Sequence, residues 1–142
     1  MVTEERFPPP AGYRWKDQVR RLEVPTPGGA TTLAAWTVVG RFVWEAGALD
    51  VPGLATAHLL RYLVRVSAAG ASGEARLYNV DDAAEVPGSL VSFAETAFAP
   101  KTSVPTMPAA GTKQIEVQVR KVAGAAGDKA GLDSCSLKVT YS

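Results

Sequence analysis

The sequence predicts an all-β protein: an antiparallel β-sandwich of about eight short strands behind an extended N-terminal arm. The first observation is a period-two alternation of apolar and polar residues over most of residues 31–142. The second is the recurrence of Gly-, Pro- and Asp-rich turns at short, fairly even intervals, which is typical of sandwiches and barrels. The third is the lack of a fixed-period repeat, which argues against propellers and solenoids.

The composition fits a single globular domain. A chain of 142 residues with 46% hydrophobic and 20% charged residues can bury a core without disulfides or a structural metal. The net charge is +1 and the Lys and Arg residues are spread along the chain, so capture of nucleic acid by charge is not expected. No apolar run approaches the ~20 residues that span a bilayer, so we expect no membrane partner.

Residues 1–30 are expected to form the arm, and residues 31–142 the sandwich domain. The run Phe7-Pro8-Pro9-Pro10 excludes a helix and indicates a polyproline-type segment, because proline lacks the backbone donor and restricts the residue before it. Residues 19–24 are compatible with either a strand or one short helical turn. The turn residues 25–29 then close the arm.

The arm also carries the candidate partner contacts. These are Phe7, Pro9, Tyr13 and Trp15. Large aromatic side chains in a segment with little periodicity suit an arm that becomes ordered on a neighbouring surface. The first seven residues are polar and lack the apolar stretch of a signal peptide, so we expect a soluble protein made in a cytoplasm.

The first strand of the sandwich is expected within residues 32–45. Its apolar face would hold Trp36, Val38, Phe42 and Trp44. Gly40 lies between them, and a glycine in mid-strand suggests a bulge or a close backbone approach. The Asp-Val-Pro-Gly run at residues 50–53 is typical of a turn.

The next strand is expected at residues 58–67. One face would hold His58, Leu60, Tyr62, Val64 and Val66, and the other Leu59, Arg61, Leu63 and Arg65. Residues 57–63 would also suit a short helix, but the regular alternation favours a strand.

The middle of the sandwich is less regular. Residues 74–80 predict a strand and residues 81–84 a turn. Residues 85–97 are expected to continue as one strand with a kink at their Pro-Gly pair. Residues 101–107 predict an edge or broken strand, because Pro105 cannot donate to a β-ladder.

The last two strands have the clearest patterns. Residues 113–122 alternate Ile115, Val117 and Val119 with polar residues, as a half-buried antiparallel strand does. A glycine-rich loop over residues 123–131 precedes the final strand at residues 132–141. Its inward residues would be Cys135, Leu137, Val139 and Tyr141.

No group of residues predicts a catalytic or cofactor site. Cys135 lies on an apolar strand face and indicates a small buried hydrophobe rather than a nucleophile. His58 also lies on an apolar face, and one Cys with one His is too few for zinc. The glycines between residues 124 and 131 connect two strands, so they predict no phosphate-binding loop. We therefore expect no enzymatic activity.

An acidic turn offers oxygen ligands that calcium accepts, but the same residues suit a solvated hairpin turn better. Those residues are Asn79, Asp81, Asp82 and Glu85. We therefore expect no metal ion at this turn.

Aromatic side chains leave a sugar-binding alternative open, because planar rings stack against a saccharide face. The candidates are Tyr13, Trp15, Trp44, Tyr62 and Tyr78. The interpretation we favour places Trp36 and Trp44 in the core and uses Tyr13 and Trp15 to attach the arm to a neighbouring surface.

Two stretches resemble a jelly-roll β-sandwich found in tailed-phage virion proteins and in related carbohydrate-binding-like modules. These are residues 75–82, Ala-Arg-Leu-Tyr-Asn-Val-Asp-Asp, and residues 86–89, Val-Pro-Gly-Ser. Residues 115–120 and 137–139 are similar to the last two strands of that fold. The resemblance covers roughly residues 57–142 and describes strands and a hairpin, with no site residues.

The resemblance implies a structural role in a virion. The expected function is a capsid decoration or cement protein that binds neighbouring capsid subunits through its arm and sandwich surface. A tail or neck accessory protein is the alternative, and a carbohydrate-binding module for host surface glycans is the alternative of another class. The expected partners are other virion proteins and further copies of the chain in a homo-oligomer, and the expected location is the virion.

Overall fold

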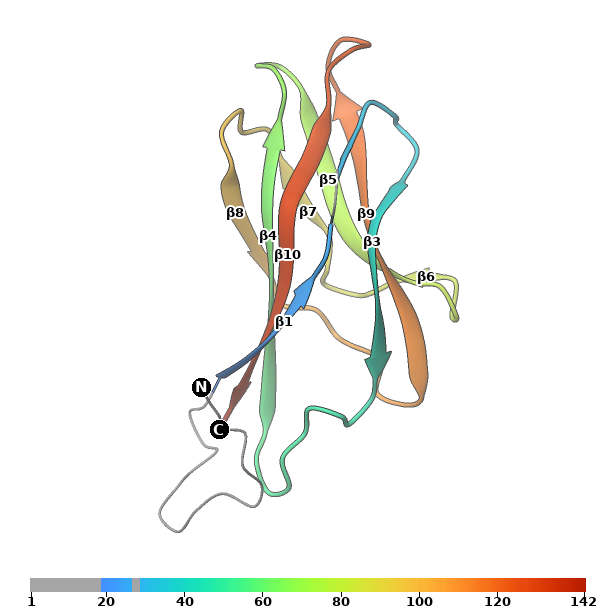
Figure 1. Cartoon of the computed structure of the whole chain (residues 1–142), viewed down its shortest axis with the longest axis vertical. Helices are drawn as coiled ribbons and strands as arrows, with labels where there is room; N and C mark the ends of the chain where they lie inside the picture. Colours follow the sequence, from blue (N-terminus) through green and yellow to red (C-terminus); the bar gives the residue numbers. More distant parts are fainter. Residues whose placement is uncertain (1–18, 27–28) are drawn as a thin grey trace.

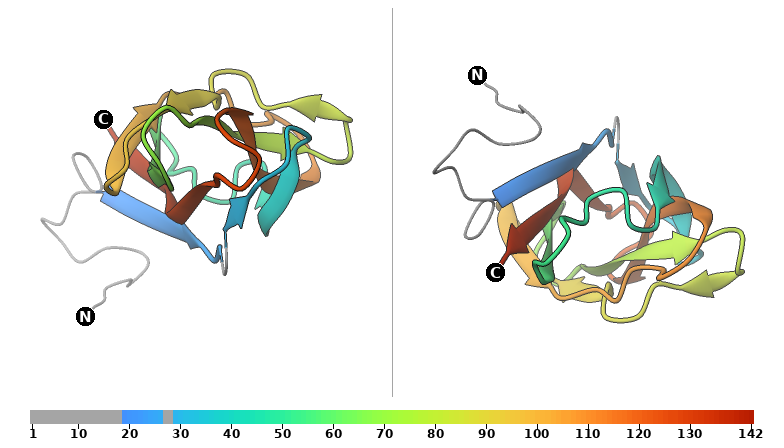
Figure 2. Two further views of the ribbon diagram at one scale, coloured as in Figure 1. Left: turned by 90° about the horizontal axis from the view of Figure 1, so that it is seen from above. Right: turned by 90° about the horizontal axis from the view of Figure 1, so that it is seen from below.

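The computed structural model describes residues 19–26 and 29–142, which form ten β-strands and no helix. The strands assemble into two antiparallel sheets of five strands each, packed face to face (Figure 1 and Figure 2). The all-β sandwich predicted from the sequence is therefore confirmed. Within the described residues, no helix is found that could cross a membrane.

Sheet A consists of β1 (Val19–Val24), β10 (Ala130–Tyr141), β4 (Thr56–Val66) and β8 (Ala99–Ser103) in that order, with β2 (Ala30–Thr31) also pairing to β10. Sheet B consists of β3 (Thr37–Glu45), β9 (Thr112–Ala123), β5 (Ser72–Asn79) and β6 (Ala84–Glu85), with β7 (Val91–Phe93) also pairing to β5. The three longest strands, β4, β9 and β10, lie inside the sheets, hydrogen-bonded on both sides.

The core lies between the sheets and is built from the alternate residues predicted to face inward. The buried side chains of these strands include Leu60, Tyr62, Val64 and Val66 of β4, Ile115, Val117 and Val119 of β9, and Cys135, Leu137, Val139 and Tyr141 of β10. This alternation fixes the register, because a slip by one residue would turn a strand's apolar face toward solvent.

The sandwich begins earlier than the expected boundary at residue 31. Residues 19–24, which we assigned to the arm, form β1 and pair with β10 from Val19 opposite Thr140 to Val24 opposite Cys135. Val24 is buried in the core, and half-buried Leu22 packs against it. Six residues with two inward apolar side chains are too short a pattern to separate a strand from a helical turn in the sequence alone.

A bulge reverses the alternation expected in the first strand of the sandwich. β3 starts at Thr37, and the register shifts between Val38 and Gly40, which confirms the predicted irregularity. Val39 is therefore buried, whereas Val38 is 36% exposed. The expectation that Trp36 shares the core face with Trp44 is wrong, because Trp36 precedes the bulge and lies on the outer face of sheet B.

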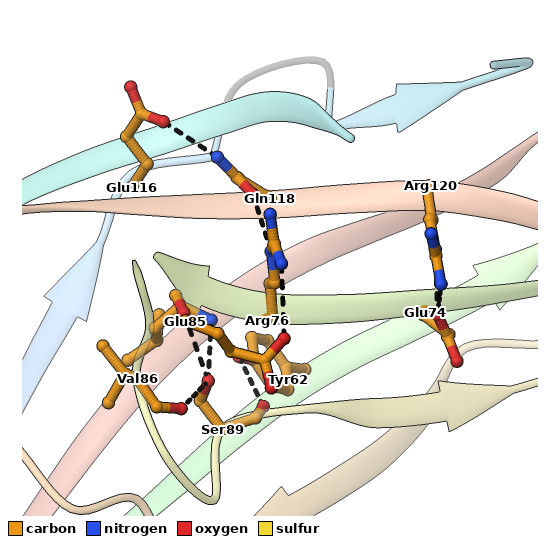
Figure 3. Close-up of polar contacts among 10 residues, drawn as sticks. Tyr62, Glu74, Arg76, Glu85, Val86, Ser89, Glu116, Gln118 and Arg120 are labelled. Atoms are coloured by element: carbon orange, nitrogen blue, oxygen red, sulfur yellow. Dashed lines mark hydrogen bonds and ion pairs between the residues drawn. The ribbon is translucent and has the colours of Figure 1, made fainter. Parts of the chain in front are cut away.

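Residues 85–97 do not form one strand, contrary to expectation. They form β6 and β7, separated by a turn in which Gly88 has φ +77°. The buried hydroxyl of Ser89 accepts the N–H of Leu77 and donates to the carbonyl of Val86 (Figure 3). A side chain that takes over these backbone bonds interrupts the ladder at the edge of β5.

Candidate functional site

The outer face of sheet B carries a stacked group of aromatic rings and guanidinium groups. Arg76 of β5 lies 4.1 Å from the ring centre of Trp36 and 4.8 Å from that of Tyr78. Arg120 of β9 lies 4.6 Å from the same Trp36 ring. These are cation–π distances, so the rings of Trp36 and Tyr78 already have cationic partners within the chain.

The two arginines of this stacked group are neutralised within the sheet. Arg76 donates to Gln118 at 2.8 Å and to Glu85 at 3.3 Å (Figure 3). Arg120 donates to Oε1 of Glu74 at 2.9 and 2.6 Å (Figure 3). Glu74 and Arg120 are also directly opposite each other in the register, which is a favourable cross-strand pair. The two arginines that stack on Trp36 therefore have carboxylate partners within sheet B.

The outer face of sheet A differs, because its cations form no ion pair with a carboxylate of the described part of the chain. Arg61 and Arg65 alternate with the buried residues of β4, and Lys138 alternates with those of β10. Arg21 of β1 lies directly opposite Lys138 in the register. Among the described residues, no carboxylate forms an ion pair with any of these four side chains. We call this set, Arg21, Arg61, Arg65 and Lys138, the cationic face.

A groove of about 470 Å³ lies at one end of the cationic face. Its polar lining includes Arg65, Ser67, Lys129 and Asp133. The ring of Phe98, 48% exposed, borders it, with the Arg65 guanidinium 4.5 Å from the ring centre. The groove combines an exposed aromatic ring with hydrogen-bond donors and hydrogen-bond acceptors.

Cys135 is buried in the core, as the sequence predicts. Burial raises the pKa of its thiol to about 12. The thiolate is the nucleophilic form of cysteine, and it is therefore absent near neutral pH.

We predict that Cys135 in the folded protein does not react with iodoacetamide in mildly alkaline buffer, and that it reacts once denaturant unfolds the chain. Mass spectrometry of the alkylated protein measures both states. Alkylation of the folded protein at the rate of a free cysteine would contradict the assignment of Cys135 to the core.

His58 is half-buried near the start of β4, where its ring meets Trp44 edge-on with ring centres 5.6 Å apart. Burial lowers the pKa of His58 from 6.5, and the nearby Asp50 carboxylate partly offsets that effect. The neutral imidazole is therefore the form that the fold favours.

The depressed pKa of His58 predicts a small loss of stability in acid. Below pH 6.5 the unfolded chain binds a proton that the folded chain resists, so the free energy of unfolding falls as the pH drops through this range. Melting temperatures measured above and below pH 6.5 should show this slope. The slope should disappear in His58→Phe; the same slope in that variant would assign it to other groups.

The acidic turn uses its oxygens within the protein. Asp81 accepts the backbone N–H of Gln114 at 2.6 Å. Asp82 accepts the side-chain amide of Asn79 at 3.0 Å and forms an ion pair with Lys113 at 2.8 Å. In residues 19–26 and 29–142, no three His, Cys, Asp or Glu side chains gather where a metal ion could be held.

The aromatic candidates for sugar stacking are mostly unavailable. Trp44 is buried and donates its indole N–H to the Pro108 carbonyl at 2.9 Å. Tyr62 is fully buried and donates to the Ser89 carbonyl at 3.0 Å (Figure 3). Tyr78 is half-buried beside Arg76. Tyr13 and Trp15, and the candidate partner contacts Phe7 and Pro9, lie outside the described residues.

Two features of the surface are not predicted from the sequence: the position of Arg21 opposite Lys138 and the exposed ring of Phe98. The alternation of β4 does place Arg61 and Arg65 outward, as observed. The juxtaposition of Arg21 with Lys138, however, depends on a register between residues far apart in the chain. The exposed ring of Phe98 immediately precedes β8 and has no periodic neighbours that would mark it.

Comparisons with known proteins identify the fold. No protein-family model and no curated protein matches the sequence. The chain is similar to the CBM36-1 domain of a multidomain xylanase from the hindgut metagenome of Trinervitermes trinervoides, with a TM-score of 0.51 and 10% identity over 84% of this chain and 96% of that chain. At this identity the likeness shows a shared β-sandwich fold.

Two further structures are similar at lower TM-scores. One is a carbohydrate-binding module CBM36 in complex with calcium and xylotriose, with a TM-score of 0.48 and 13% identity over 87% of this chain and 99% of that chain. The other is a structure of infectious bursal disease virus, Gx strain, with a TM-score of 0.47 and 14% identity over 87% of this chain and 32% of that chain.

Proposed function

We propose that this chain is a non-catalytic structural protein of a tailed-phage virion, a capsid decoration protein that attaches through the cationic face to an acidic surface of neighbouring subunits. The jelly-roll resemblance of residues 75–82 and 86–89 supports the virion assignment. A binding role also fits the described residues, in which the cysteine is buried and Glu74 and Glu85 of sheet B are engaged with arginines.

The observation that carries the proposal is the position of Arg21 opposite Lys138. Like charges directly opposite each other destabilise a sheet, and no carboxylate of the described residues pairs with either of them. Sheet B shows the opposite arrangement, with Glu74 opposite Arg120. An acidic partner would neutralise the cationic face, so the repulsion is relieved in the assembly rather than in the isolated chain.

The direct experiment is the purification of virions grown from the genome that encodes this chain. The proposal predicts that the chain copurifies with intact particles at a copy number matching the capsid lattice. Immunogold labelling separates the alternatives within the virion, since label confined to one end of the particle would favour a tail or neck protein. A chain that stays entirely in the particle-free fraction would contradict a structural role.

The arm is proposed as a second contact, through Phe7, Pro9, Tyr13 and Trp15. A truncation that removes residues 1–18 tests it cleanly, because it leaves β1 in sheet A. The truncated protein should fold and lose occupancy on the particle. Truncation at residue 28 is not a suitable test, because it removes an entire strand of the sandwich.

Carbohydrate binding is the second candidate, and the groove beside Phe98 is the observation that favours it. The similar domain of the xylanase is named as a carbohydrate-binding module. An exposed ring beside polar groups is the arrangement on which a sugar could stack. A glycan array should then show binding that Phe98→Ala removes and Val122→Ala, at another exposed apolar residue, retains. An array without binding would argue against this candidate.

A further inference from the structure

The edge of sheet B is self-complementary. Among the strands that the structure describes, β3 is the outermost of this sheet and pairs only with β9 (Figure 1). Ala46 donates its backbone N–H to Gly111, so residue 46 faces β9. The direction of the backbone N–H and C=O groups alternates along an antiparallel strand. The backbone groups of residues 42 and 44 therefore also face β9, whereas the backbone groups of Arg41, Val43 and Glu45 point away from it. The carbonyl of Glu45 already accepts the N–H of Ala48 at 3.1 Å, so the outward groups that another strand could use are those of Arg41 and Val43 and the N–H of Glu45. Such a row on an edge strand is a template for another strand.

The side chains of the same three residues share the outer face of sheet B. Val43 is 60% exposed, and the side chain of Arg41 is 71% exposed although it lies 3.6 Å from Glu116. Glu45 is exposed and has no ion-pair partner among the described residues. The edge therefore presents a cation, an apolar side chain and an anion at alternate positions.

We propose that two copies of the chain pair antiparallel along β3, with the two-fold axis at Val43. In this register Val43 lies opposite its own copy, and Arg41 lies opposite Glu45 of the partner subunit. The outward backbone groups let the two copies of Val43 exchange two hydrogen bonds, and they let Glu45 donate its N–H to the Arg41 carbonyl in each charged pair. A pair of opposite charges directly across two strands stabilises a sheet, and so does a pair of apolar side chains. The two copies of sheet B then form one continuous sheet, an isologous interface.

The other edges of the described sheets fit less well. β8 contains Pro100, and β6 and β7 have only two and three residues. β1 carries a similar pair, Arg21 and Glu23, around Leu22. Leu22 packs against the core, however, so pairing at β1 would bury no exposed apolar residue at the two-fold axis. β3 is thus the edge at which backbone, charge and apolar matches coincide.

A charge swap tests the proposal on the full chain by analytical ultracentrifugation. Arg41→Glu should raise the dimer dissociation constant roughly tenfold, because like charges then face each other at both ends of the paired segment. The double variant Arg41→Glu/Glu45→Arg should restore dimerisation, since it exchanges the charges without changing the pairing. Arg21→Glu, the matched change on β1, should leave the dimer unaffected. A monomer at all concentrations, or a dimer weakened by Arg21→Glu instead, would overturn the proposal.

Disulfide trapping gives an independent readout. Val43→Cys places two thiols at the two-fold axis, where hydrogen-bonded partners have Cα atoms about 5.5 Å apart, within disulfide range. The matched control is Val122→Cys, at an exposed valine near the end of β9. Mild oxidation should crosslink Val43→Cys into a covalent dimer and leave Val122→Cys monomeric. Equal crosslinking of the two variants, or none in Val43→Cys, would contradict pairing at β3. The buried Cys135 does not compete.

Discussion

Replacing Tyr62 by alanine is expected to lower the free energy of unfolding by about 3–5 kcal/mol, the range for removing a buried aromatic side chain. Tyr62 is fully buried in β4, between the two sheets. Its hydroxyl donates to the Ser89 carbonyl at 3.0 Å, in the turn between β6 and β7. The substitution therefore leaves a cavity in the core and also removes the bond that ties this turn to sheet A. Urea denaturation followed by fluorescence measures the loss.

Two companion variants separate the causes. Tyr62→Phe keeps the ring and removes only the hydrogen bond, so it should cost about 1 kcal/mol. Tyr78→Ala removes a half-buried tyrosine from the outer face of sheet B and should cost clearly less than Tyr62→Ala. If Tyr62→Ala were no more destabilising than Tyr78→Ala, the placement of Tyr62 in the packed core would be wrong.

Replacing Gly88 by alanine is expected to lower the free energy of unfolding by about 2–5 kcal/mol, through backbone strain and overpacking together. Gly88 has φ +77°, a conformation that side chains disfavour. A Cβ atom at this position would also overlap the carbonyl oxygen of Val104. The neighbouring backbone cannot withdraw easily, because Thr106 donates to the Pro87 carbonyl at 2.8 Å.

Gly70 provides the matched control for Gly88. Its φ is +89°, but a Cβ atom there would meet nothing within 4 Å. Gly70→Ala should therefore cost only the conformational strain, about 1–2 kcal/mol. Thermal melts of the two variants measure the difference. Equal losses for the two glycines would show that the segment around residue 88 does not pack against residues 104–106 as described.

The long central strands can be predicted from the sequence because each has one buried face. In β9, Ile115, Val117 and Val119 alternate with polar residues, and the structure buries all three. The same argument succeeds for β4 and β10. A strand with one buried face and one solvent-exposed face shows a two-residue alternation of apolar and polar side chains, which is visible without knowledge of the neighbouring strands.

The positions that sequence reasoning misassigns are those where distant contacts decide the conformation. The bulge at Val39 reverses the alternation of β3 next to Gly40, where a Cβ atom would lie 2.5 Å from the Pro25 carbonyl oxygen. The turn before β7 depends on bonds between Ser89 and Leu77. β1 becomes recognisable only when it pairs with β10. None of these partners is adjacent in the sequence, so no local pattern reports them.

The candidate surface likewise has one part that can be predicted from the sequence and one part that cannot. The alternation of β4 predicts that Arg61 and Arg65 face outward, and they do. Arg21 lies opposite Lys138, and neither forms an ion pair with a carboxylate in residues 19–26 or 29–142; this becomes visible only in the register of sheet A. The feature on which the proposed function depends is thus a property of the folded sheet rather than of any one segment.

The most direct test of this function is the attachment of Lys138→Glu to purified virions, compared with Lys121→Glu, the same change of charge on sheet B. Lys138→Glu places a carboxylate opposite Arg21, so the isolated protein should be as stable as the original or slightly more stable. It should nevertheless lose attachment to the particle, whereas Lys121→Glu should retain it. If both variants bind the particle equally well, the cationic face is not the docking surface and the proposed mode of attachment is wrong.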